Sequence, residues 1–206
     1  MVERLILASA SPRRAELLTA SGYEFDVRPP PYEEPETESP RLSATEHAEA
    51  LSFFKARSVA ELLPAGLVLA ADTVVAHRDR LFGKPEDADD ARRILHSLTG
   101  TTHEVITGVT LLDAATGSRL IRHAVTCVTM RPMPPAAMDE YIASKAWQGK
   151  AGAYGIQDHG DAFVKQIDGS FSNVVGLPME LLAEMLDEFE QARRARATET
   201  PNDPPR

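Results

Sequence analysis

The stretch that decides the fold is residues 103–130, HEVITGVTLLDAATGSRLIRHAVTCVTM. Two long runs rich in β-branched residues, 103–113 and 118–130, flank the turn-forming residues 114–117. This pattern is typical of a β-hairpin, so we expect two adjacent antiparallel strands. Shorter apolar runs alternate with helical patterns on both sides of the hairpin. Together these features predict an α/β fold with a mixed, twisted sheet and flanking helices.

The segments around the hairpin follow the same two periodicities. Short apolar or β-branched runs predict strands at 4–8, 25–28, 67–71, 154–157 and 162–168. Apolar spacing with start and stop signals predicts helices at 12–20, 45–63, 85–98, 135–144 and 177–189. We expect residues 29–39, PPPYEEPETES, to form an exposed loop, because their prolines exclude a regular helix or a central strand.

Composition limits the class of protein. The chain has 206 residues, of which 43% are hydrophobic, and we expect one domain over residues 1–190 and a disordered tail at 191–206. With 22 basic and 31 acidic residues the formal net charge is -9, which argues against a non-specific nucleic-acid binder but not against a small anionic ligand.

The single cysteine, Cys127, rules out an intramolecular disulfide and a cysteine-rich zinc site. No apolar run approaches the ~20 residues of a membrane span, and the start has no secretory signal, so we expect a cytoplasmic protein.

The first candidate site is the run Ser9-Ala10-Ser11-Pro12-Arg13-Arg14, where a predicted strand passes into a predicted helix. A helix N-terminus offers free N–H groups and a positive dipole end, and two arginines add donors for phosphate oxygens. The alternative is that Ser11 only caps the helix and that the arginines form a solvated first turn.

Two further signals are an acid and a lysine. Asp72 ends the apolar run 67–71, a position where acids in α/β folds commonly hold a metal ion or activate water; the alternative is a turn between two strands. Lys84 precedes the predicted helix 85–98 and lies either at its positive end or in a surface loop. Taken alone, Lys55 on the predicted helix 45–63 is a solvent-facing lysine.

The small residues of KAGAYGIQ (150–157) would let the backbone approach a ligand, and Gln157 could read a base edge with paired donor and acceptor groups. A tight turn with a structural glutamine is the alternative. The run GSFSNVVGLP (169–178) favours a loop that leads into the last helix. His103 follows a helix stop and stands out slightly among histidines that show no metal-binding spacing.

Taken together, these segments resemble the Maf family of nucleoside triphosphate pyrophosphatases. The matching runs are LASASPRR (7–14), AADTVV (70–75), GKP (83–85), LTGTTHEVITGV (98–109), KAGAYGIQ (150–157) and GSFSNVVGLP (169–178), in family order. The resemblance implies hydrolysis between the α and β phosphates with Mg²⁺ or Mn²⁺, a Maf/ITPase-like fold with a cleft between two lobes, and a homodimer.

The resemblance also implies roles for individual residues. Asp72 would be the proton acceptor that activates water, and it would hold the metal together with Glu33 or Glu34, whose register in the acidic loop stays open. The residues implied in substrate binding are Ser9, Arg13, Arg14, Lys55, Thr73, Lys84 and Gln157, of which Arg13, Thr73 and Gln157 match positions tied to substrate choice.

The run KAGAYGIQ resembles the branch of the family that acts on dTTP and UTP and keeps nucleotide pools clean. The chain departs from the family pattern at Asp158, where glycine is usual after the glutamine. Two alternatives stay open: a 7-methyl-GTP pyrophosphatase, and a non-catalytic nucleotide-binding regulator of cell division.

Overall fold

A single mixed sheet organises the chain. The computed structural model describes residues 4–31, 42–157 and 162–199. Within them the strands are β1 (Leu5–Leu7), β2 (Phe25–Val27), β3 (Leu67–His77), β4 (Arg80–Phe82), β5 (Thr102–Asp113), β6 (Arg119–Met130) and β7 (Val164–Asp168). Their order is β2-β1-β3-β5-β6-β7, with β4 paired to β3. Strand β1 pairs in parallel with β2 and β3, whereas the other pairs are antiparallel, which confirms the predicted mixed sheet.

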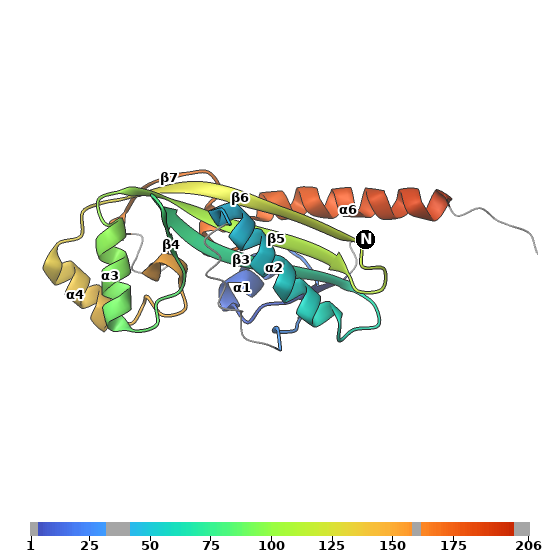
Figure 1. Ribbon diagram of the computed structural model, residues 1–206, viewed down its shortest axis with the longest axis horizontal. Helices are drawn as coiled ribbons and strands as arrows, with labels where there is room; N and C mark the ends of the chain where they lie inside the picture. Colours follow the sequence, from blue (N-terminus) through green and yellow to red (C-terminus); the bar gives the residue numbers. More distant parts are fainter. Residues whose placement is uncertain (1–3, 32–41, 158–161, 200–206) are drawn as a thin grey trace, which may run out of the picture.

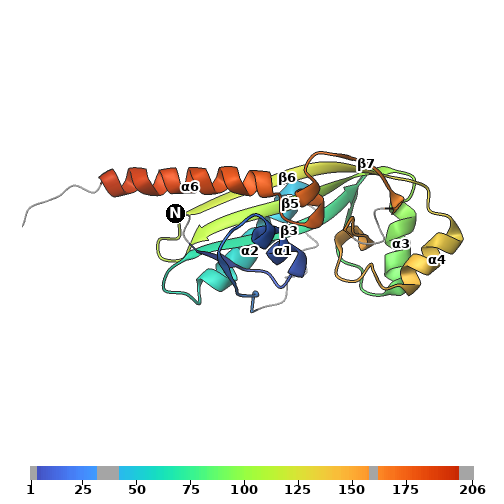
Figure 2. The same ribbon diagram turned by 180° about the vertical axis from the view of Figure 1, so that it is seen from behind.

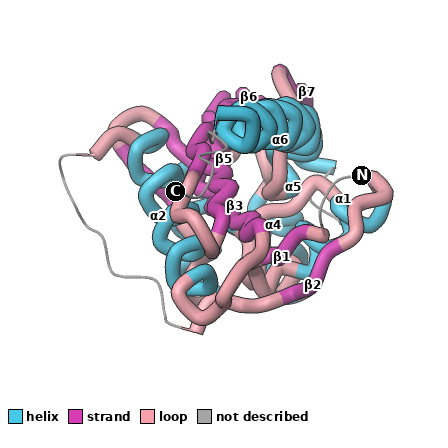
Figure 3. The backbone as a smooth tube through the Cα atoms, turned by 90° about the vertical axis from the view of Figure 1, so that its right-hand side faces the viewer, coloured by secondary structure: helices cyan, strands magenta, loops and turns pink. Residues whose placement is uncertain are grey.

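Helices cover both faces of the sheet. They are α1 (Pro12–Ala20), α2 (Ala44–Ala60), α3 (Ala88–Leu98), α4 (Pro135–Ala143), the 3-10 helix η1 (Ala151–Ala153), α5 (Phe171–Val175) and α6 (Met179–Glu199). Figure 3 shows α2 on one side of the sheet and α1 and α6 on the other. Side chains of β3 alternate between these layers: Leu69 packs in the core with α6, and Ala70 packs in the core with α2.

The molecule has two lobes joined by the long strands β3, β5 and β6 (Figures 1 and 2). A small lobe holds β4, α3, α4 and η1, and its core contains Leu95, Tyr141, Trp147 and Tyr154. A large lobe holds β1, β2, α1, α2 and α6. No helix in the described ranges is long and apolar enough to cross a membrane.

The absence of a side chain at Gly108 lets helix α2 contact the sheet directly. A Cβ at this position would lie 2.3 Å from the carbonyl oxygen of Ala48 on α2, so only glycine fits under the helix. One turn further along, the hydroxyls of Ser52 and Thr110 are hydrogen-bonded at 2.8 Å in a fully buried position. These two contacts fix where the next turn of α2, which carries Lys55, meets the sheet.

Several predicted elements are confirmed and others need correction. The hairpin strands and helix α1 appear where the sequence predicts them. Strand β3 does not end before Asp72 but continues to His77, because β5 pairs with it along that whole length. The predicted strand 154–157 is wrong: this segment follows η1, where the positive φ angles of Gly152 and Ala153 turn the chain, and it forms no strand.

The C-terminal region differs from the prediction as well. The last helix does not end at 189 but continues to Glu199, so the predicted tail 191–206 is helical over its first part, and residues 200–206 lie outside the described ranges. Good helix formers and an i,i+4 ion pair between Glu190 and Arg194 support this extension. The run 169–178 is not simply a loop, because it forms helix α5, whose N-cap Ser170 accepts a hydrogen bond from the Asn173 N–H.

Candidate active site

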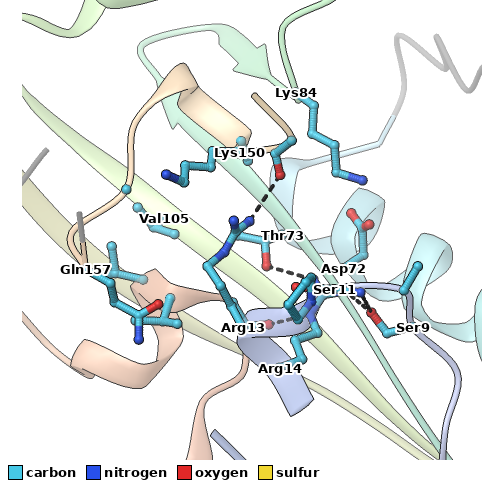
Figure 4. Close-up of a pocket in the computed structure, with 18 of the residues that line it drawn as sticks. Ser9, Ser11, Arg13, Arg14, Asp72, Thr73, Lys84, Val105, Lys150 and Gln157 are labelled. Carbon is cyan, nitrogen blue, oxygen red and sulfur yellow. Dashed lines mark hydrogen bonds between the residues drawn. The ribbon is translucent and has the colours of Figure 1, made fainter. Parts of the chain in front are cut away.

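A cavity of about 770 Å³ opens where the edge of β3 has no strand partner in the described chain. Strand β1 pairs with β3 only as far as Leu69, and β4 begins to pair with it at Val75. The intervening stretch faces the cavity, which is completed by the start of α1, the loop before η1 and the end of α5 (Figure 4). The cavity has the size of an ordinary small-molecule site and takes its walls from both lobes.

The strand break lets neighbouring residues on opposite faces of β3 reach one cavity. Asp72 points to the α2 face and forms an ion pair with Lys55. Both side chains are buried, each at 8% exposure. A buried carboxylate needs a paired charge, and Lys55 supplies it. The prediction that Lys55, taken alone, faces solvent is therefore wrong. The close contact of α2 with the sheet at Gly108 helps to place Lys55 beside Asp72.

Thr73 points to the other face, where Arg14 organises the site. The Arg14 guanidinium donates to the carbonyl of Gly176 at 2.8 Å, to the Ser9 hydroxyl at 3.1 Å and to the Thr73 hydroxyl at 3.2 Å. The Thr73 hydroxyl also lies 2.9 Å from that of Thr107. Arg14 thus joins the loop before α1, strand β3 and the end of α5.

Arg13 reaches across the cavity to the small lobe. Its guanidinium donates to the carbonyl of Gly149 at 3.0 Å (Figure 4). The side chain of Ser11 makes no cap hydrogen bond, which is contrary to the alternative that it only caps the helix, so it does not occupy the N–H groups at the start of α1. This helix end lines the cavity and can therefore act on an anion.

Lys84 enters the cavity from the loop after β4 (Figure 4). The helix predicted to start right after it begins instead at Ala88, with Asp87 as its N-cap. The backbone N–H of Gly152 donates to the carbonyl of Gly83 at 3.0 Å, which ties this loop to η1. Gln157 lines the same cavity, at the end of the segment that follows η1.

The charge of the lining is one-sided. Among its described residues the basic ones are Arg13, Arg14, Lys55, Lys84 and Lys150, and the sole acid is Asp72. In a chain of net charge -9 this is a local concentration of positive charge. Such a concave cationic lining attracts a polyanion.

All the substrate-binding residues predicted from the sequence line this one cavity. Glu33 and Glu34 lie outside the described residues. The described part of the chain holds no cluster of three or more acids, histidines or cysteines suited to a metal ion.

Three contacts of the site were not predicted from the sequence. Lys150 begins the quoted run 150–157 and its ammonium donates to the Ala146 carbonyl at 2.6 Å. The Gly176 carbonyl binds Arg14, and the Ser170-to-Asn173 capping pattern was the available signal for the short helix before it. His103 bonds to Tyr154 of the lining at 2.6 Å, a contact between residues too far apart in the chain to be read from local pattern.

Comparisons with known proteins agree on the family. The family model described as "Maf-like protein" matches residues 4–189. A "dTTP/UTP pyrophosphatase" of Ruminiclostridium cellulolyticum is 42% identical over 92% of this chain and 98% of its own. A protein of the same name from Anaeromyxobacter sp. is 46% identical over 90% of this chain and 89% of its own. Another, from Rhodopirellula baltica, is 44% identical over 92% of this chain and 83% of its own.

Among solved structures, a HAM1 protein from Coxiella burnetii is 17% identical, with a TM-score of 0.43 over 62% of this chain and 73% of that chain, a likeness too weak to support an argument. The family match covers far more than half of the chain, and the chain covers 83% to 98% of the length of the three relatives named above. The chain belongs to the family of Maf-like proteins.

Proposed function

We propose that this protein is a nucleoside triphosphate pyrophosphatase that hydrolyses dTTP and UTP to the nucleoside monophosphate and pyrophosphate. The observation that carries the proposal is the cavity itself, in which one buried carboxylate faces basic residues from both lobes. The names of the relatives, dTTP/UTP pyrophosphatases at 42% to 46% identity, support the choice of substrate.

The basic residues bind the triphosphate. Arg13, Lys84 and the N-terminus of α1 lie around the cavity so that the phosphate chain can contact both lobes at once. Arginine and lysine stabilise the negative charge that develops on the departing pyrophosphate, and they do so more strongly in a cavity than in open water.

Asp72 acts as the base. Its carboxylate takes a proton from a water molecule as the water oxygen bonds to the α-phosphorus, and the bond from that phosphorus to the oxygen bridging to the β-phosphorus breaks. Pyrophosphate leaves with that oxygen and the electron pair. Lys55 holds the carboxylate in place and offsets its charge while it is buried.

The residues fit a divalent cation of the Mg²⁺ type. This ion is commonly held by one or two carboxylates together with substrate phosphates rather than by a cage made of protein alone, and Asp72 is the one acid in the described lining. Asp72 with Glu33 or Glu34 would hold Mg²⁺ or Mn²⁺. The ion would supply charge neutralisation at the phosphates.

Gln157, at the end of the segment that follows η1, recognises the nucleotide base. Gln157 carries a donor and an acceptor, which suits the adjacent O4 and N3–H groups of thymine and uracil. Thr73 and Arg13 complete the set of residues that determines substrate choice.

The proposal also covers the domain, the assembly and the location of the protein. Residues 1–190 form one catalytic domain, which works as a homodimer in the cytoplasm and binds neither nucleic acid nor membrane.

A pyrophosphate-release assay tests the function. The purified chain is incubated with Mg²⁺ or Mn²⁺ and with dTTP, UTP, CTP and 7-methyl-GTP in parallel. We expect release from dTTP and UTP in preference to the others. Preference for 7-methyl-GTP would move the protein to the other branch, and nucleotide binding without hydrolysis would indicate a regulator rather than an enzyme.

A further inference from the structure

A buried histidine lies directly behind the wall of the cavity. His103 on β5 is 2% exposed, and its Nε2 atom lies 2.6 Å from the hydroxyl of Tyr154, which is 5% exposed and lines the cavity. The two rings meet edge to face with centroids 5.4 Å apart. The other ring nitrogen of His103 has no hydrogen-bond partner among the described residues, so Tyr154 is the polar contact that this side chain makes there.

The pair is uncharged over the physiological pH range. Burial, with a smaller contribution from His77, lowers the pKa of His103 to about 4. Burial also raises the pKa of the Tyr154 hydroxyl above its ordinary value. A neutral histidine and a neutral phenol can hydrogen-bond without desolvating a charge, which suits a permanent contact in a core better than a proton-transfer relay.

The contact lies close to Gln157 in the chain. The start of its segment is held by the Arg13 contact to Gly149, by the Lys150 ammonium on the Ala146 carbonyl and by the Gly152 contact to Gly83. Past Gly152, the Ala153 N–H donates to the Lys150 carbonyl at 3.1 Å, and the residues nearest to Gln157 are held by the hydroxyl contact of Tyr154 and the burial of Ile156. Gln157 itself is exposed and lines the cavity three residues after Tyr154.

We infer that His103 is a positioning residue for base recognition, which acts through Tyr154 to hold the segment that presents Gln157 to the nucleotide base. The inference rests on the proposed function and extends it to two residues that belong neither to the cations of the lining nor to its acid. It separates two properties of the site: the pair governs which base is accepted, whereas the cations and Asp72 govern phosphate binding and hydrolysis.

The test compares two readouts in variants of the full chain. One is the ratio of kcat/KM for dTTP to that for CTP. The other is inhibition of dTTP hydrolysis by inorganic tripolyphosphate, a probe with phosphates but no base. The variants are Tyr154→Phe, His103→Leu and the double variant; the double variant keeps the inference testable if His103→Leu alone fails to fold, because it leaves no unpaired hydroxyl.

Tyr141→Phe is the matched control, because Tyr141 is equally buried in the same core but is not part of the cavity lining. We expect the dTTP-to-CTP ratio to fall roughly fivefold in Tyr154→Phe and in the double variant, the change that one hydrogen bond of ordinary net strength confers. Inhibition by tripolyphosphate in these variants should stay within about twofold of its value in the unchanged protein. Tyr141→Phe should match the unchanged protein in both readouts.

An unchanged ratio in both Tyr154→Phe and the double variant would overturn the inference while leaving the proposed function intact. An equal fall in Tyr141→Phe would also overturn it, since selectivity would then follow core packing in general. Absence of hydrolysis of every nucleotide by the unchanged protein is a different result, because it would refute the proposed function itself.

Discussion

Replacing Gly108 by alanine should disturb the buried ion pair of Asp72 and Lys55 by displacing helix α2. Gly108 pairs with Asp72 across the two strands, and its missing side chain is what allows α2 to lie against β5. The Cβ of alanine would lie 2.3 Å from the Ala48 carbonyl oxygen and 2.6 Å from the Glu49 nitrogen. These are backbone atoms of a helix, so no side chain can rotate away and the helix itself must move.

The size of the movement follows from these distances. Ordinary contact begins at 3.4 Å, so the 2.3 Å approach must open by about 1 Å. Overpacking of this kind costs about 1–3 kcal/mol of unfolding free energy. Lys55 lies two turns further along the same helix and moves with it, away from Asp72. Since a misplacement of about 1 Å can cost on the order of 100-fold in rate, we expect kcat for dTTP to fall by about 10- to 100-fold.

Thermal unfolding and steady-state kinetics at a temperature where the variant is folded measure the two effects. The control is Gly117→Ala, at a turn with φ +71° where an added Cβ meets nothing within 4 Å. That control should lose about 1 kcal/mol through its backbone conformation and keep its turnover. Native stability and native kcat in Gly108→Ala would refute the reasoning, as would an equal loss of kcat in the control.

Three other predictions use different measurements. Gln157→Ala should change the ranking of dTTP, UTP, CTP and 7-methyl-GTP more than it changes inhibition by tripolyphosphate; an unchanged ranking in the nucleotide panel counts against base recognition by Gln157. Arg13→Ala removes both a cation and the contact to Gly149, so it should weaken tripolyphosphate inhibition as well as selectivity, and loss of neither would remove Arg13 from the site. Burial lowers the pKa of His103 from 6.5 to about 4, so as the pH falls the unfolded state takes up a proton before the native state does. The free energy of unfolding is therefore unaffected by this group well above pH 6.5 and falls by about 3 kcal/mol as the pH drops from 6.5 toward 4. Urea unfolding of the His103→Leu, Tyr154→Phe double variant should show a shallower acid dependence than the unchanged protein, and an identical dependence would contradict this origin.

Local signals in the sequence were sufficient where local physics decides the structure. Helix α1 appears at the predicted residues because Pro12 sets its first turn. The hairpin of β5 and β6 follows from two β-branched runs around one turn. That Arg13, Arg14 and Lys84 belong to one site could also be predicted, but only from the family resemblance of several short motifs taken together.

Contacts between distant segments account for what the sequence did not indicate. Lys55 taken alone looks solvent-facing, and only the close approach of α2 over Gly108 buries it against Asp72. The run 154–157 resembles a strand in composition, yet the positive φ angles before it turn the chain. The contact between His103 and Tyr154 joins two motifs that are 51 residues apart, a pairing that no periodicity encodes.

The most direct measurement is the product analysis of dTTP hydrolysis by the unchanged protein and by Asp72→Asn, with Mg²⁺ present and nucleotide binding measured alongside. We expect equal amounts of dTMP and pyrophosphate from the unchanged protein. The variant should bind dTTP nearly as well but turn it over about two to four orders of magnitude more slowly, as expected for the loss of a general base. Near-normal turnover by the variant, or release of orthophosphate instead of pyrophosphate, would contradict the assignment of Asp72 as the residue that activates water in this cavity.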